Sequence, residues 1–93
     1  MQKAFLIGYD LHRPGQDYQS LYQAIKSYQV YWHMLDSTWI IQSSRSAVEI
    51  RDHLKQHIDR NDRLFVARLS GEAAWYGFAD DGSDWLKKQL RAA

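Results

Sequence analysis

Asp10 is the residue whose type and position point most directly to chemistry. It follows the almost wholly apolar run at residues 4–9, a pattern that suits a buried strand in the middle of a sheet. A carboxylate at the end of such a strand costs free energy to desolvate unless something pairs with it. Asp10 is therefore either a hydrogen-bond acceptor for the turn that follows or a functional carboxylate.

His12 and Arg13 come directly after this strand and before the Pro-Gly turn at 14–15. Both side chains would be able to reach a phosphate group bound near Asp10. Arg13 has an alternative role, because it can instead pair with Asp10 or Asp17. Both interpretations of Arg13 stay open at this point.

Histidines provide two further candidates. His53 and His57 are four residues apart in an expected helix, a spacing that can bind a metal ion. No cysteine and no obvious third ligand accompanies them, so solvated or helix-capping histidines are the preferred interpretation. His33 lies in an expected strand and would matter for function only if it pointed to the same side as Asp10. A hydrogen-bonded strand histidine is the ordinary alternative.

Aromatic side chains are numerous, with 4 Trp, 6 Tyr and 3 Phe in 93 residues. Five of them offer surfaces on which unpaired RNA bases could stack: Tyr31, Trp32, Trp39, Trp75 and Tyr76. The Lys/Arg-Gly-Phe pattern of RNA-recognition strands is absent, and aromatic residues of a small domain usually pack in its core. Binding of single-stranded RNA is therefore kept as one alternative function.

Composition and charge exclude several classes of protein. The net charge is +1 and basic residues between 45 and 63 alternate with acidic ones, which is not the pattern of a constitutive nucleic-acid binder. The absence of cysteine excludes disulfides and thiolate metal sites. The run at 4–9 is too short to cross a bilayer and no leader pattern precedes it, so a cytoplasmic protein without a membrane segment is expected.

Three helices are expected to position these groups. Apolar residues recur at helical spacing between 18 and 28, after a candidate N-cap at Asp17. Ser46 and Glu49 form a capping box at the start of a second helix. Acidic residues from Asp80 onward, followed by basic ones, predict a last helix.

Four segments have the composition and alternation of strands: 4–9, 30–35, 38–41 and 64–69. Their order among the helices predicts an α+β protein with a ferredoxin-like βαββαβ fold and an added C-terminal helix. Residues 1–93 are expected to form a single domain, with a core over 3–69 and an aromatic and helical extension over 70–93. Within the extension, residues 73–78 are compatible with either a strand or a short helix.

The strands carry apolar side chains at both alternating positions, whereas two helices cover only one face of such a sheet. The second face is therefore expected to meet the C-terminal segment, a second subunit, or both, and a homodimer is predicted.

Several short motifs in this order have a counterpart in a known family. They are the Tyr-Asp motif at 8–11, the serine-plus-apolar strand at 36–40, the apolar spacing of the second helix, and the acidic residue and strand at 62–69. Over roughly residues 3–69 the chain resembles the CRISPR-associated adaptation protein Cas-two and its superfamily, which also includes toxin ribonucleases of the virulence-associated D type. The chain departs from that family in its C-terminal helix, which stands where the family has a strand, and in its diluted basic surface.

The resemblance implies a homodimer in which Asp10 of each subunit holds one divalent metal ion, Mg²⁺ or Mn²⁺, on the two-fold axis. A metal placed there would activate water against a phosphodiester. Asp10 would then be the catalytic and metal-binding residue of a metal-dependent endonuclease acting on DNA or RNA, with His12 and Arg13 contacting nucleic acid. The alternatives are a catalytically silent dimeric scaffold or regulator of the same fold and the RNA-binding module described above.

Overall fold

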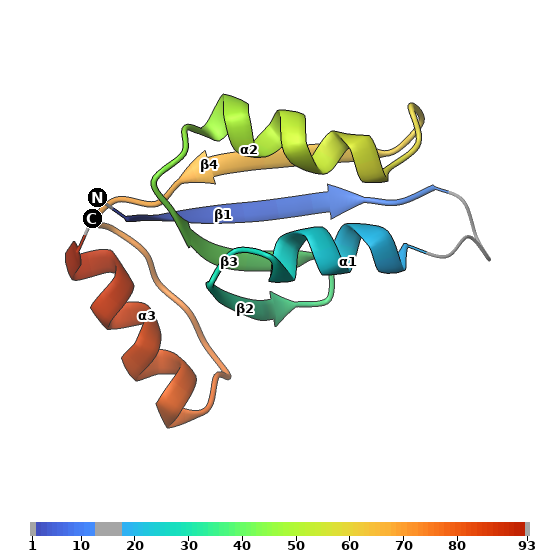
Figure 1. Ribbon diagram of the computed structural model, residues 1–93. Coiled ribbons are helices and arrows are strands. Elements are labelled where there is room, and N and C mark those ends of the chain that lie inside the picture. The colour runs from blue at the N-terminus through green and yellow to red at the C-terminus, as the bar shows by residue number, and fades with distance from the viewer. Residues whose placement is uncertain (1, 13–17, 93) are drawn as a thin grey trace.

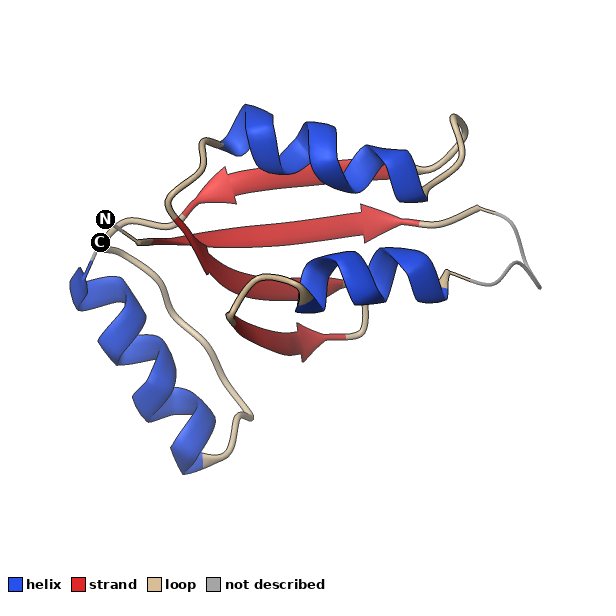
Figure 2. Ribbon diagram, in the orientation of Figure 1, coloured by secondary structure: helices blue, strands red, loops and turns tan. Residues whose placement is uncertain are grey.

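The computed structural model describes residues 2–12 and 18–92 of the chain. In chain order its elements are β1 (Lys3–Asp10), α1 (Gln19–Lys26), β2 (Val30–Leu35), β3 (Thr38–Ser43), α2 (Ala47–Leu54), the 3-10 helix η1 (Lys55–His57), β4 (Arg63–Arg68) and α3 (Asp80–Ala92) (Figure 1). The described residues thus form an α+β structure with one four-stranded antiparallel sheet and three α-helices (Figure 2). This architecture is compatible with a ferredoxin-like arrangement.

The sheet has the strand order β2-β3-β1-β4, and every neighbouring pair is antiparallel. β1 therefore lies between β3 and β4, with Ile7 opposite Trp39 on one side and Val66 on the other. The β2–β3 connection at 36–37 forms a tight hairpin, and the pairing has a register shift between Trp32 and Leu35.

Helices α1 and α2 lie together on one face of this sheet (Figure 1). The core fills the space between them and β1, β3 and β4. Its buried members are Phe5, Ile7, Tyr18, Leu21, Ala24, Ile25, Tyr28, Trp39, Ile41, Ile50 and Leu54. The helical spacing at 18–28 correctly predicted the buried face of α1. The expected N-cap Asp17 lies outside the described residues.

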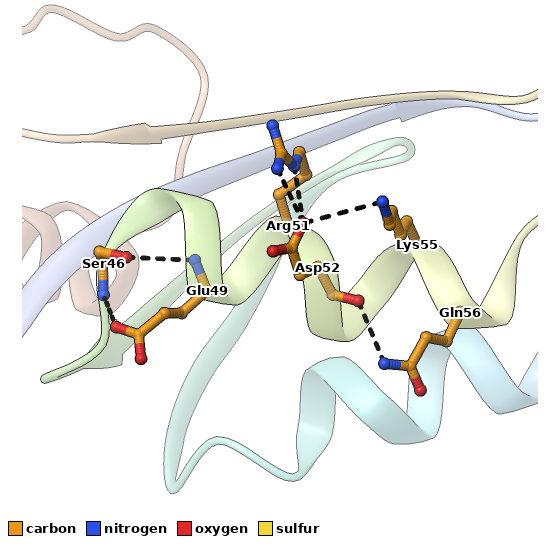
Figure 3. A network of polar contacts seen from close by, with 6 residues as sticks. All are labelled: Ser46, Glu49, Arg51, Asp52, Lys55 and Gln56. Carbon is orange, nitrogen blue, oxygen red and sulfur yellow. Dashed lines mark hydrogen bonds and ion pairs between the residues drawn. The ribbon is translucent and has the colours of Figure 1, made fainter.

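The capping box predicted at the start of α2 is confirmed (Figure 3). The Glu49 N–H donates to Ser46 Oγ at 3.1 Å, and the Ser46 N–H donates to Glu49 Oε1 at 2.9 Å. These bonds to the backbone and side chain of Ser46 lower the pKa of Glu49. Further along the helix, Arg51 donates to the Asp52 carboxylate at 2.8 Å. The start of α2 is thereby fixed by its own side chains.

We expect Ser46→Ala to lower the free energy of unfolding by about 1 kcal/mol, because an orphan amide at the start of α2 loses its acceptor. Urea denaturation monitored by circular dichroism measures the loss. Ser46→Asp keeps an acceptor at the same position and should retain the wild-type midpoint. Equal midpoints for wild type and Ser46→Ala would show that the cap adds nothing to stability.

The second face of the sheet is partly covered by α3 and the segment that leads to it. Trp32 of β2 packs edge-on against Phe78 and Trp85, with ring centroids 5.4 and 5.6 Å apart. The Gln42 side chain donates a hydrogen bond to Gln89 of α3. Residues 73–78 form neither the strand nor the short helix that their composition allowed, but an irregular chain leading to α3. The C-terminal segment thus covers part of this face, as expected.

Helix α3 and the segment before it leave the second face of the sheet uncovered near the carboxyl end of β1. Figure 1 shows α3 beside the end of the sheet where β1 begins, away from the end of β1 that carries Asp10. Phe65 of β4, opposite Gly8 in the register, keeps 63% of its surface exposed. We name the area around Phe65, Gly8 and Asp10 the open patch. A large apolar side chain exposed there leaves room for a partner.

Candidate functional site at the end of the first strand

Asp10 is the last residue of β1 and faces away from α1 and α2. Side chains alternate along a strand, and Ile7 and Phe5 point into the core, so Leu6, Gly8 and Asp10 share the opposite face. The strand is buried as expected, but the Asp10 side chain itself is 64% exposed. The predicted cost of desolvating this carboxylate therefore does not arise, because water reaches it directly.

His12 completes a pair with Asp10. Its Nε2 atom lies 3.1 Å from Asp10 Oδ2, and its side chain is 45% exposed. Arg63 of β4 is the cross-strand neighbour of Asp10. A carboxylate oxygen and an imidazole nitrogen are both metal ligands, and a guanidinium group suits phosphate. The structure thus brings together Asp10 and His12, two of the three predicted site residues; Arg13 lies outside the described residues.

Asp62 takes over, for the His12 amide, the structural role that one interpretation gave to Asp10. Its carboxylate accepts from the His12 N–H at 2.8 Å, from the Asp59 N–H at 2.8 Å, and from the Tyr18 hydroxyl at 3.0 and 3.1 Å. The His12 amide is the part of the post-strand turn that falls within the described residues, and its partner is Asp62. This leaves the Asp10 carboxylate available for another role. In the sequence, Asp62 entered only through the family resemblance.

The hydrogen bonds to Asp62 also set its protonation. Burial alone would raise its pKa, but the bonds from His12, Asp59 and Tyr18 outweigh burial and lower the pKa of the Asp62 carboxyl. A carboxyl group with a lowered folded-state pKa stabilises the fold above its unfolded pKa. That contribution is lost as the pH falls through the folded-state value.

We therefore expect Asp62→Asn to lower the melting temperature at pH 7 and to flatten the dependence of stability on pH below about pH 4. Thermal melts of both proteins across pH 2.5–7 measure this. Asp36→Asn serves as the control, since Asp36 is an exposed carboxylate in the β2–β3 turn. Parallel pH curves for wild type and Asp62→Asn would contradict the role given to Asp62.

The structure separates His33 from this site. The His33 ring stacks on Trp39 with centroids 4.0 Å apart, on the sheet face covered by α1 and α2. Its Nε2 atom lies 3.0 Å from the Asp36 carbonyl oxygen. His33 is thus a hydrogen-bonded strand histidine and lies on the opposite face from Asp10.

His53 differs from the solvated or capping histidine that the sequence suggested. It is partly buried, and its Nδ1 atom lies 2.9 Å from the Tyr28 hydroxyl. The ring of His57 stands edge-on to it at a centroid distance of 5.9 Å. Within residues 2–12 and 18–92, no three His, Asp or Glu side chains gather closely enough to hold a metal ion. One protomer therefore supplies at most part of such a site among those residues.

The five aromatic residues considered for base stacking do not share one surface. Trp39 is 2% exposed and faces α1 and α2, whereas Trp32 packs on the other face against α3. The indole N–H of Trp75 donates to Ser83 Oγ at 2.9 Å. Tyr31 and Tyr76 are exposed, at 45% and 97%, but belong to separate parts of the structure. The stacking surface inferred from the sequence is thus divided between two faces.

No protein-family model matches the sequence, and no solved structure matches the chain significantly. In the part of the chain that the structure describes, no helix is both long enough and apolar enough to cross a membrane.

Proposed function

We propose that this chain is a homodimeric, metal-dependent endonuclease with a ferredoxin-like βαββαβ fold, in which Asp10 is the central metal ligand. One observation carries the proposal. Asp10 and His12 form an exposed pair, Arg63 is the register neighbour of Asp10, and the His12 amide donates to Asp62 rather than to Asp10. The resemblance to the Cas-two superfamily, which also centres on Asp10, agrees with it.

The open patch supports the homodimer. Phe65 exposes 63% of its surface beside Gly8, and burying such a side chain is worth about 1.5–3 kcal/mol. A Cβ atom added at Gly8 would meet only Leu6 and the Ser37 carbonyl, at 3.9 and 4.0 Å, which are ordinary contact distances. The protomer itself therefore has no steric need for glycine there. Close approach of a second copy supplies a reason for it.

A second copy would also complete the metal site. One protomer offers Asp10 and His12, and a two-fold axis at the open patch would add the same pair from the other copy. Carboxylate oxygens suit Mg²⁺, and a mixed carboxylate and imidazole set suits Mn²⁺. A bound cation would relieve the repulsion between two carboxylates and supply activation of water for attack on phosphorus.

The remaining side chains hold the substrate. Arg63 is the register neighbour of Asp10 on β4, and its guanidinium group would suit the phosphodiester of a bound substrate. With a net charge of +1, the dimer would rely on this local arrangement rather than on a broadly basic surface.

The direct test is cleavage of single-stranded and duplex DNA and RNA by the purified protein with Mg²⁺ or Mn²⁺ and with EDTA. The proposal predicts cleavage that requires metal and Asp10. A dimer that cleaves none of these substrates would leave the silent scaffold as the function of this fold.

A further inference from the structure

A second concave site lies at the opposite end of the sheet from Asp10. It is a cavity of about 380 Å³ located where β1 begins and β3 ends. Its lining residues are Gln2, Ser27, Tyr28, Gln29, Gln42, Ser43, Ser44, Arg45 and His53. β1 has eight residues, so this cavity and Asp10 are separated by about 25 Å. The two sites are therefore independent in space.

The cavity is lined by polar and basic groups and by no acidic group. It contains serine and tyrosine hydroxyls, three glutamine amides, one imidazole and the guanidinium group of Arg45, but no carboxylate. Arg45 thus contributes the permanent charge of the cavity. A cavity with one cation, many hydrogen-bond donors and no acid attracts an anion.

Tyr28 and His53 form a fixed, uncharged wall of this cavity. Their hydroxyl oxygen and Nδ1 atom are 2.9 Å apart, and Tyr28 is only 8% exposed. Burial raises the pKa of the Tyr28 phenol despite the opposing charge of Arg45. Burial, together with Arg45 and His57, lowers the pKa of His53. Both groups are therefore mainly uncharged at pH 7. Arg45 then supplies the charge in this cavity that an anion would meet.

The loop that carries Arg45 is held at both ends. Ser43 is 5% exposed, and its Oγ atom accepts from the Arg45 N–H at 3.0 Å. The next residue, Ser46, is fixed by the capping box with Glu49. The Glu49 carboxylate accepts there from the Ser46 N–H, and it also interacts with the charge of Arg45. The backbone of the Arg45 loop is thus pre-organised before any ligand binds.

We propose that this cavity binds a small phosphorylated, hydroxyl-rich molecule of the sugar-phosphate class. The Arg45 fork and the hydroxyls of Ser43 and Ser44 match the several acceptor oxygens of a phosphate group, whereas the Ser27 hydroxyl already donates to the Ala24 carbonyl. The amides of Gln2 and Gln29 can donate and accept, as the hydroxyls of a sugar require, whereas Gln42 is already bonded to Gln89. A volume near 380 Å³ falls within the range of small-molecule sites. It has room for a sugar beside the phosphate group.

Isothermal titration with ribose 5-phosphate, ribose and malonate tests the proposal on the full chain. Ribose 5-phosphate should bind saturably to the wild type, and ribose should bind at least 10-fold more weakly. Arg45→Gln should weaken ribose 5-phosphate binding by at least 10-fold. Arg45→Lys keeps the positive charge but loses the forked guanidinium group. Its affinity for ribose 5-phosphate should lie between those of the wild type and of Arg45→Gln.

Arg60→Gln is the matched control, because it removes the same charge from an exposed residue outside this cavity. It should bind like the wild type, and so should Asp10→Asn, which separates this proposal from the proposed nuclease. Unchanged affinity in Arg45→Gln, an equal loss in Arg60→Gln, tighter binding of malonate than of ribose 5-phosphate, or no saturable binding would each overturn it.

Discussion

Asp10→Asn is expected to reduce metal-dependent cleavage by on the order of 100-fold or more. Even removing a group that only supports a metal ligand commonly costs 10- to 100-fold, and Asp10 is proposed as the ligand itself. The fold should survive the change, since the Asp10 side chain is 64% exposed and the His12 amide donates to Asp62 instead. The dimer should remain intact or gain stability, because the two copies no longer bring repelling carboxylates together.

Initial rates on DNA and RNA, with Mg²⁺ and with Mn²⁺, measure the effect. Asp84→Asn provides a matched control, because it removes one exposed carboxylate from α3, which lies beside the other end of the sheet (Figure 1). If Asp10→Asn cleaves at the wild-type rate, Asp10 is not the metal ligand and the cleavage belongs to another site.

Phe65→Glu is expected to convert the proposed dimer into a monomer of 11.0 kDa. Two copies of Phe65 would be buried at the open patch, and at about 1.5 kcal/mol each their loss weakens association by roughly 100-fold. Burying two like charges without partners adds to this cost. The protomer should keep its secondary structure, because Phe65 is already 63% exposed within it.

Sedimentation or light scattering at tens of micromolar measures the change. Val48→Glu is the control: Val48 is 56% exposed, but it lies on α2, on the other side of the sheet from the open patch. It should remain dimeric. A wild type that is monomeric at these concentrations, or a Phe65→Glu protein that stays dimeric, would remove the open patch as the interface.

Much of the secondary structure followed from local signals. The Ser46–Glu49 capping box predicted the start of α2, and the spacing at 18–28 predicted the buried face of α1, because both depend on residues within one or two turns. The two sequence-adjacent strands β2 and β3 were also found where alternation placed them. Residues 73–78 could not be assigned in this way. Their aromatic side chains pack against distant residues, such as Phe78 against Trp32, so tertiary contacts decide their conformation.

The candidate sites were harder to predict, since they depend on residues far apart in the chain. Asp62 binds the His12 amide 50 positions away, and His53 pairs with Tyr28 across 25 positions. No local pattern joins these partners. The Asp10–His12 contact could be anticipated because the two residues are neighbours in sequence. The placement of Arg45 with Tyr28 and His53 required the sheet to bring the end of β3 beside α1 and α2.

Metal-dependent thermal stability tests the central claim most directly, since it reports binding at Asp10 whether or not the right nucleic acid has been found. At Mn²⁺ concentrations about 100 times the dissociation constant, one ion shared by two protomers should raise the wild-type melting temperature by about 5–10 °C. Asp10→Asn should melt at the same temperature with and without Mn²⁺. A wild type whose melting temperature does not respond to Mn²⁺ or Mg²⁺, or an Asp10→Asn protein that responds equally, would contradict a shared metal site at Asp10.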